Sequence, residues 1–301
     1  MTATVPRQLV HRAAVAETFL TDWVTAGTDR FCVSAQWPRA HSLFVSPDRA
    51  TYEPLLVIET VRQCGALLAH AEYGVPLGHQ FVLQELRVTT YPEHLAVAGV
   101  PAELVLDITC SEIQRRGSVT TGIRYRADVR RDGAVVARAE VGFSCVSESV
   151  YRRLRGGRTP ASVSALSPPP GIPAAAVHRT TGADVVLAPA DKRGRWQLRV
   201  DTGHPVLFDH PLDHVPGMLF LEAARQAVRV RVGSARRVQA SFHATFHRYA
   251  ELDRPTWMEV VAAEEDGTQV RVAATQDEQT VFECTVGTVA IAAHSARSAA
   301  G

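Results

Sequence analysis

An internal repeat constrains the fold of this chain more than any other feature of its sequence. The stretch from His41 to Gly65 aligns without a gap with the stretch from His204 to Val228. Four polar positions are identical in that register: His41 and His204, Glu59 and Glu222, Arg62 and Arg225, Gln63 and Gln226. Similar segments also begin each half, at Val10-His11-Arg12 and Val177-His178-Arg179. Because two copies are too few for a solenoid, we expect two fused copies of one domain.

A proline-rich segment separates the copies. Residues 156–176 contain five prolines and almost no large apolar side chain. This composition predicts a surface linker with extended, polyproline-like character. We therefore expect an N-terminal domain over residues 1–155, the linker over 156–176 and a C-terminal domain over 177–301.

The same order of elements is predicted in both copies. Apolar residues three or four positions apart predict a helix over 54–70, which starts with a proline, and a matching helix over 217–230. Strand patterns precede and follow each helix. They cover 30–37, 81–90, 102–110, 119–129 and 135–143 in the first copy, and 196–201, 240–250, 256–263, 268–275 and 280–291 in the second. One long helix followed by an antiparallel meander is the order of a hot-dog domain, so we expect an α+β double hot dog. Its two helices should lie side by side on one continuous antiparallel sheet.

Charge and composition exclude several classes of function. The 32 Lys and Arg residues against 31 Asp and Glu leave a formal charge of +1, which argues against a nucleic-acid partner. No apolar stretch approaches the roughly 18 to 20 residues of a membrane helix, and the start lacks a signal core, so we expect a cytoplasmic protein without a membrane partner. The five cysteines are scattered and form no C-x-x-C pair. They predict reduced, mostly buried thiols, and we expect neither a metal nor a cofactor.

The start of the second helix, Pro216-Gly217, resembles the helix entry of hot-dog acyl-carrier-protein dehydratases. Glycine allows the backbone to approach a thioester, and its N–H, at the positive end of the helix dipole, can hold a developing oxyanion. Those dehydratases carry a catalytic histidine eight residues before the proline. Phe208 and Val45 occupy that position in the two copies, so dehydration is disfavoured.

Both helices carry Glu-x-x-Arg-Gln, as Glu59, Arg62 and Gln63 in the first and Glu222, Arg225 and Gln226 in the second. Residues three apart share a helix face, so each glutamate and arginine can point into one cavity. The alternative is a pair of surface ion pairs, worth about 0 to 1 kcal/mol each. We favour a role in the site, because the flanking residues are apolar and a buried carboxylate is costly unless it is paired or functional.

Further polar residues are candidates for the site. His210 and His214 approach the second helix and could act as general bases; the alternative is that Asp213 or His214 caps the helix or bonds the loop. A metal is disfavoured there because no clear third ligand accompanies them. His11-Arg12 and His178-Arg179 could bind phosphate or a carrier protein, or be structural positions. Arg248 is expected on one face of a strand, either solvated or binding phosphate.

Several segments across the chain carry a family resemblance. They are Leu9-Val10-His11-Arg12, Glu53-Pro54-Leu55-Leu56 with residues 58–63, residues 73–78, residues 150–156, and residues 213–218 with 221–227. Together they resemble the A-factor synthase (AfsA-type) family, whose members make γ-butyrolactone and related butenolide or furan signals. Tyr52-Glu53 stands where the second copy has Val215-Pro216, which indicates that the copies are not equivalent.

The resemblance implies transfer of a β-ketoacyl chain from acyl carrier protein to a hydroxyl of dihydroxyacetone phosphate. No G-x-S-x-G motif is present, which favours direct transfer of the thioester's acyl group without an acyl-enzyme. On this interpretation Glu59 or Glu222 is the general base, Gly217 N–H stabilises the oxyanion, and Arg62 or Arg225 holds the carbonyl or the phosphate. The substrate contacts are expected from His210, His214, Arg248, Gln63 and Gln226. The alternatives are a hot-dog thioester hydrolase, in which the same glutamate activates water, and a non-catalytic acyl-binding module.

Overall fold

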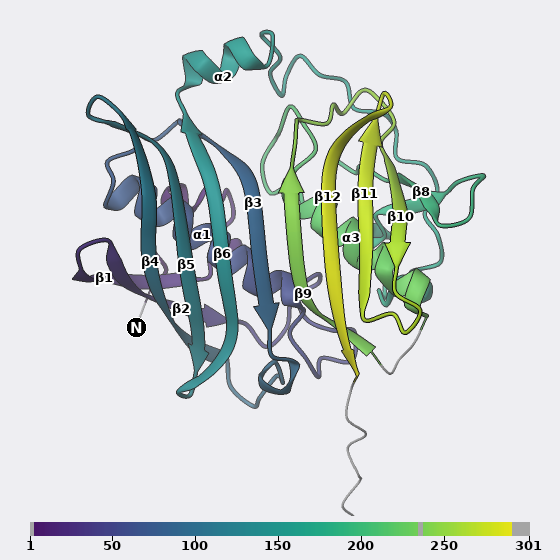
Figure 1. Ribbon diagram of the computed structural model, residues 1–301, viewed down its shortest axis with the longest axis horizontal. Helices are drawn as coiled ribbons and strands as arrows, with labels where there is room; N and C mark the ends of the chain where they lie inside the picture. The colour runs from purple at the N-terminus through teal and green to yellow at the C-terminus, as the bar shows by residue number, and fades with distance from the viewer. Residues whose placement is uncertain (1–2, 234–236, 291–301) are drawn as a thin grey trace, which may run out of the picture.

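The two long helices begin and end close to where the sequence predicts them. In the computed structural model, which describes residues 3–233 and 237–290, α1 spans Pro54–Ala71 and α3 spans Gly217–Val232. Pro54 occupies the first turn of α1, where its missing N–H costs no helical hydrogen bond. Gly233 ends α3 in the left-handed conformation, with φ of 65°. Both helices cover the same face of one sheet and contact each other (Figure 1).

The sheet is continuous across both copies. Its strands are β1 (Leu20–Gly27), β2 (Arg30–Trp37), β3 (Gln80–Thr90), β4 (Ala102–Arg116), β5 (Val119–Arg131) and β6 (Ala134–Val146) in the first copy, and β7 (Leu187–Pro189), β8 (Arg195–Leu198), β9 (Arg237–Phe246), β10 (Trp257–Ala263), β11 (Gln269–Gln276) and β12 (Gln279–Ala290) in the second. The twelve strands follow the order β1-β2-β4-β5-β6-β3-β9-β12-β11-β10-β8-β7. Read inward from each edge, the two halves have the same order and meet at β3 and β9. The double hot dog with one shared antiparallel sheet is therefore confirmed.

Two strands and one α-helix were not expected from the sequence. They are β1, β7 and the short helix α2 (Glu148–Leu154). β1 is an edge strand whose residues after Leu20 are mostly exposed, so it carries no alternating apolar signal. The strand expected over 240–250 ends at Phe246 instead, and residue 291 of the last expected strand lies outside the described residues.

The proline-rich segment is attached to the second copy. Leu166 N–H donates to Leu252 O at 3.0 Å, and Ile172 N–H donates to Leu187 O at 3.0 Å. The segment therefore lies along the second domain.

The core fills the space between the helices and the sheet. α1 is buried along almost its whole length. All five cysteines are free thiols, and all except the half-buried Cys32 are buried. None of the helices in the described part of the chain combines the length and apolar character that a membrane crossing requires.

Candidate active site

A buried polar network is repeated in the two copies. In the second, the Glu222 carboxylate accepts hydrogen bonds from Arg179 Nη2 at 2.8 Å, Arg225 Nε at 2.8 Å and Gln226 Nε2 at 2.5 Å. In the first, Glu59 accepts the equivalent bonds from Arg12, Arg62 and Gln63. The structure thus gives the His-Arg segments at the start of each copy a role in holding the helix glutamate.

The network keeps both glutamates ionised. Each carboxylate is fully buried, and burial alone would raise its pKa. The charges and hydrogen bonds of the two arginines beside it outweigh burial and lower the pKa of both glutamates to about 2. A carboxylate with that pKa is a poor proton acceptor at neutral pH, so the geometry favours a structural role for Glu59 and Glu222 over the expected general-base role.

The two glutamines belong to the same network. Gln63 and Gln226 each accept a backbone N–H, from Phe19 and Val186 respectively, at 3.0 Å. Both side chains are fully buried, and neither lines a described cavity. Each glutamine joins its long helix to the residue just before the first strand of the same copy. This structural role explains why the glutamine is repeated, and it differs from the substrate contact expected from the sequence.

A cavity of about 190 Å³ lies at the start of α3 and is lined by both copies. It brings together six residues that the sequence singled out: His11, Arg12, Arg62, His210, His214 and Gly217. Its remaining wall is largely apolar and includes Ile58, Phe81, Leu83, Leu86, Val141, Met218 and Leu221. Polar groups thus gather at one side of a space whose apolar side suits an acyl chain.

Gly217 presents a backbone N–H at this cavity. It is the first residue of α3, which has Pro216 at its N-cap and no side-chain cap. The positive end of the helix dipole therefore faces the space where an oxyanion would form. A Cβ at position 217 would lie 3.1 Å from Phe246 Cε1, so the absence of a side chain also allows close packing of β9.

An aspartate fixes the orientation of His214. His214 Nδ1 lies 2.7 Å from Asp213 Oδ1, and Asp213 also accepts bonds from Tyr151 Oη at 2.5 Å and Arg155 Nε at 2.9 Å. Burial would raise the pKa of Asp213, but the bonds from His214, Tyr151 and Arg155 hold it well below its usual range. The ionised carboxylate favours the tautomer with the proton on Nδ1. No residue in the described ranges bonds Nε2, which is left to accept a proton.

Three members of this group were missed as site residues: Asp213, Tyr151 and Arg155. Their only signal in the sequence is that they lie in two of the segments that carry the family resemblance. Those segments are far apart along the chain, and nothing local predicts that they meet.

Arg62 and Arg225 occupy equivalent positions but different surroundings. The Arg62 side chain is 26% exposed and lines the cavity at α3, whereas Arg225 is 1% exposed. Arg62 uses Nε and Nη2 to bind Glu59 and Val10 O, and among the described residues Nη1 has no acceptor. Arg62 therefore has a donor available for an anionic substrate. His210 lines the same cavity as Arg62, and burial and nearby positive charge lower the pKa of this histidine.

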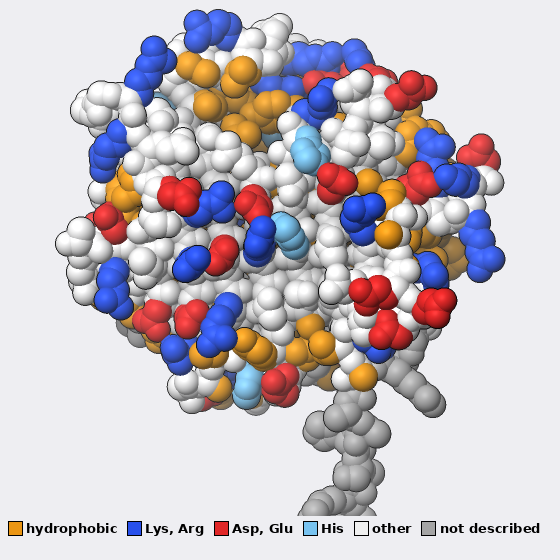
Figure 2. Space-filling model, in the orientation of Figure 1, with side chains coloured by type: hydrophobic (Ala, Val, Ile, Leu, Met, Phe, Trp, Pro, Cys, Tyr) orange, Lys and Arg blue, Asp and Glu red, His pale blue; other side chains and the backbone are white. Residues whose placement is uncertain are grey.

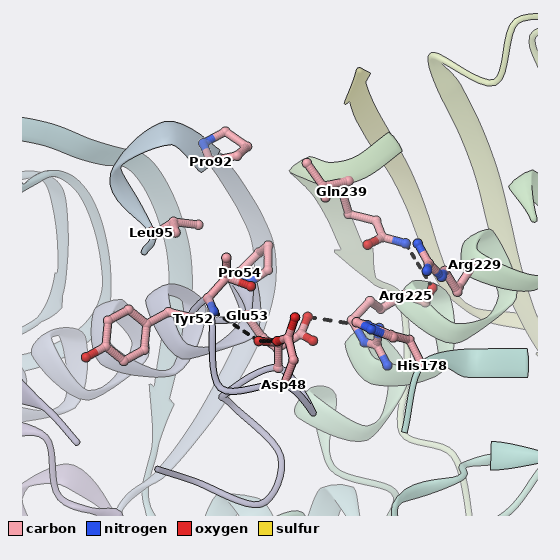
Figure 3. A pocket seen from close by; sticks show the side chains of 13 residues that line it. Asp48, Tyr52, Glu53, Pro54, Pro92, Leu95, His178, Arg225, Arg229 and Gln239 are labelled. Carbon is pink, nitrogen blue, oxygen red and sulfur yellow. Dashed lines mark hydrogen bonds and ion pairs between the residues drawn. The ribbon is translucent and has the colours of Figure 1, made fainter. Parts of the chain in front are cut away.

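The start of α1 forms the counterpart of this site, a cavity of about 300 Å³ (Figure 3). Glu53 takes the place of Pro216 there, and its Oε2 lies 4.0 Å from Arg225 Nη1. Pro54 takes the place of Gly217 and has no N–H to offer an oxyanion. Figure 3 shows Glu53 and Asp48 facing Arg225 and His178 across the space. The structure thus places Arg225 away from the α3 cavity, in a site without the oxyanion donor.

Arg248 lies outside the sheet, because β9 ends two residues before it. It is exposed, and its Nη1 donates to Gln279 Oε1 at 2.9 Å. It lines a separate groove of about 350 Å³ that shares His214 and Gly217 with the α3 cavity. No group of three or more His, Cys, Asp or Glu side chains within residues 3–233 and 237–290 is arranged to hold a metal ion.

Comparison with known proteins gives consistent results over most of the chain. The model of the A-factor biosynthesis hotdog domain (AfsA) matches residues 1–147 and 161–292. A protein of Streptomyces virginiae named 2-oxo-3-(phosphooxy)propyl 3-oxoalkanoate synthase is 49% identical over 96% of this chain and 98% of its own length. One of the same name from Streptomyces coelicolor is 42% identical over 94% of this chain and 90% of its own length.

Solved structures support the fold. An acyl-ACP thioesterase from Bacteroides thetaiotaomicron aligns with a TM-score of 0.54 and 11% identity, over 86% of this chain and 98% of that one. The dehydratase domain of the CurK module of curacin polyketide synthase aligns with a TM-score of 0.51 and 10% identity, over 91% and 97%. Identities this low show a common fold alone. The sequence matches go further, and the chain belongs to the AfsA family of A-factor biosynthesis hot-dog proteins.

Proposed function

We propose that this protein is an acyltransferase that moves a 3-oxoacyl (β-ketoacyl) group from a thioester to a hydroxyl of dihydroxyacetone phosphate. The relatives' name describes a 3-oxoalkanoate ester of a phosphooxy-propanone unit, which is the product of this transfer. The observation that carries the proposal is that His214, oriented by Asp213, and the N–H of Gly217 line one cavity with Arg62. We further propose that acyl carrier protein is the donor and that the protein acts in the cytoplasm, which its five free thiols support.

The geometry supports a direct transfer in which His214 acts as the general base. Nε2 accepts the proton of the acceptor hydroxyl while that oxygen attacks the thioester carbonyl. The carbonyl oxygen becomes an oxyanion at the N–H of Gly217. Collapse of the tetrahedral intermediate breaks the carbon–sulfur bond, and the leaving thiolate takes the proton from His214. The products are the ester and the free thiol.

Arg62 is assigned to the acceptor's phosphate, because it has a free donor at the cavity and carries its charge at every working pH. Glu59, which also accepts a hydrogen bond from Arg12, holds the Arg62 guanidinium in place. In this proposal Glu59 is a positioning residue, and Glu222 and Arg225 stabilise the second copy.

An assay of a β-ketoacyl thioester with and without dihydroxyacetone phosphate tests the function. Ester formation that requires the acceptor is the expected result. Free acid released at the same rate with or without acceptor would indicate a thioester hydrolase instead, and binding without turnover would indicate an acyl-binding module.

A further inference from the structure

Two further spaces adjoin the α3 cavity, one on each side of its set of lining residues. It shares Phe81, Leu83, His214 and Gly217 with the groove that Arg248 lines. It shares His11, Arg12, Gln80, His210 and Leu212 with a third cavity, of about 370 Å³. The α3 cavity, where the catalytic groups of the proposed function lie, is therefore flanked by the two other spaces.

The first opening, which we call the sheet-side groove, lies where the two halves of the sheet separate. β3 pairs with β9 only over Glu85–Thr89, so the residues before Glu85 leave a gap beside the end of β9. The gap exposes the start of α3, and the groove is lined mainly by apolar and aromatic side chains: Phe81, Val82, Leu83, Leu154, Val215, Phe220, Phe246 and Tyr249. Figure 2 shows hydrophobic side chains in a hollow under α2, with basic side chains around it.

Three arginines lie beside the sheet-side groove, although Arg152 is paired with Glu148 and the groove residue His247 with Glu283. Arg248 lines the groove, and Arg152 and Arg153 are exposed in the last turn of α2 beside Leu154, which also lines it. Leu154 is itself 62% exposed, an unusual position for a large apolar side chain. An apolar side chain among cations fits a partner surface that is acidic with an apolar contact at its centre.

The second opening, which we call the polar mouth, has different chemistry. It is lined by Gln8, His11, Arg12, His79, Gln80 and His210, and also by Tyr151, Leu212 and Asp213. Most of these side chains are polar, Arg12 carries a permanent positive charge, and the adjoining α3 cavity holds a second one, Arg62. A small, strongly anionic molecule suits this opening, whereas a long apolar arm does not.

We propose that the two substrates enter by separate openings and meet at His214 and Gly217. The inference rests on the proposed function and adds to it. The acyl thioester enters by the sheet-side groove on the slender arm of an acidic carrier protein, which docks on Arg153, Leu154 and Arg248. Dihydroxyacetone phosphate enters by the polar mouth. Because each substrate has its own route, the acceptor reaches the site while the carrier is still docked.

Charge reversal at each opening tests the assignment. The double variant Arg153→Glu, Arg248→Glu should raise the KM for the carrier-bound thioester about tenfold, because rim charges steer association. Two other KM values should change by less than about twofold: that for dihydroxyacetone phosphate and that for the N-acetylcysteamine thioester, which lacks the carrier. The double variant Gln8→Glu, His79→Glu should show the opposite pattern, with only the KM for dihydroxyacetone phosphate raised.

A matched control is available on the same sheet. Arg115→Glu, Arg116→Glu makes the same charge change at exposed residues of β4, which β5 and β6 separate from β3. It should leave all three KM values unchanged. If the control raised the KM for the carrier-bound thioester as much as Arg153→Glu, Arg248→Glu does, the effect would come from net charge alone. The proposed docking site would then be overturned.

Four other outcomes would also overturn the inference. Either variant could raise both substrates' KM values together, which would indicate a single entrance. A coenzyme A thioester could be as good a substrate as the carrier-bound thioester, with the same rise in KM in Arg153→Glu, Arg248→Glu. That result would show that the arginines bind coenzyme A and not a carrier protein. If the wild-type enzyme formed no ester from any donor, the proposed function and this inference would both be overturned. If the wild-type enzyme formed the ester but both double variants had the same KM values as wild type, only the inference would be overturned.

Discussion

His214 is held more closely than His210, the other histidine that the sequence placed near the second helix: its Nδ1 lies 2.7 Å from the Asp213 carboxylate, whereas His210 Nδ1 lies 3.5 Å from that of Asp209. We expect His214→Gln to lower kcat by about 10² to 10⁴, because it removes the proton acceptor, with little change in the thermal midpoint. Steady-state kinetics with ester detection, together with a thermal melt, measures both. Activity close to wild type would show that the base is another group.

Replacing the buried glutamates separates a structural role from a catalytic one. The sequence interpretation expects Glu59→Gln or Glu222→Gln to abolish turnover and leave the fold intact. The buried network leads to the opposite expectation for Glu222→Gln, which leaves two guanidiniums without their counterion and should destabilise the protein by about 3 to 5 kcal/mol. Glu59→Gln should cost less stability, because Arg62 is partly exposed, but should also weaken phosphate binding. Chemical denaturation and kinetics below the unfolding temperature provide the comparison.

The same carboxylates predict how stability depends on pH. Their pKa is about 2 in the folded protein against 4.5 ordinarily, so the unfolded state binds more protons as the pH falls through this range. The stability they contribute is complete above about pH 4.5 and is lost as the pH falls toward about 2. Denaturation midpoints measured from about pH 6 to about pH 3 should decline, and more gradually in Glu222→Gln than in wild type. Equal slopes would mean that other groups dominate the acid response.

At the scale of the element, the first residue of α3 decides whether its helix dipole can act on a substrate. Gly217→Pro places there the residue that begins α1, which the first helical position tolerates. It removes the N–H, so we expect kcat to fall by about 10² to 10³. Gly217→Ala is the control, since it adds a Cβ near Phe246 but keeps the N–H. If both variants lose the same activity, packing against β9 and not the hydrogen bond is what matters at this position.

At the scale of the whole molecule, the approximate two-fold relation between the copies produces two cavities, of which we expect one to work. Arg62→Lys keeps a charge but loses the planar fork, so the KM for dihydroxyacetone phosphate should rise with little change in that for the thioester. Arg225→Lys, at the equivalent position, should lower the thermal midpoint and leave both KM values unchanged. The reverse result would place the working site at the start of α1.

The sequence by itself determined the fold. Helix periodicity in both copies and a register without gaps predicted two helices, their order with the strands and the double hot dog, because these features depend on local spacing. β1 and α2 were not predicted from the sequence, because exposed elements carry little apolar pattern. The sequence also pointed to Gly217 and His214, since both stand at the start of a predicted helix.

Only the tertiary structure decided what the repeated polar residues do and how the two copies differ. Glu59 and Glu222 looked like site residues because each helix carries an arginine at the right spacing. Their second arginines, Arg12 and Arg179, come from distant segments, and this pairing makes each carboxylate a buried counterion. Arg62, a residue of α1, reaches the cavity at the start of α3, which is the long helix of the other copy. The arginine pairs depend on how distant segments fold together within each half, and the place of Arg62 depends on how the two halves pack against each other; no local pattern in the sequence encodes either.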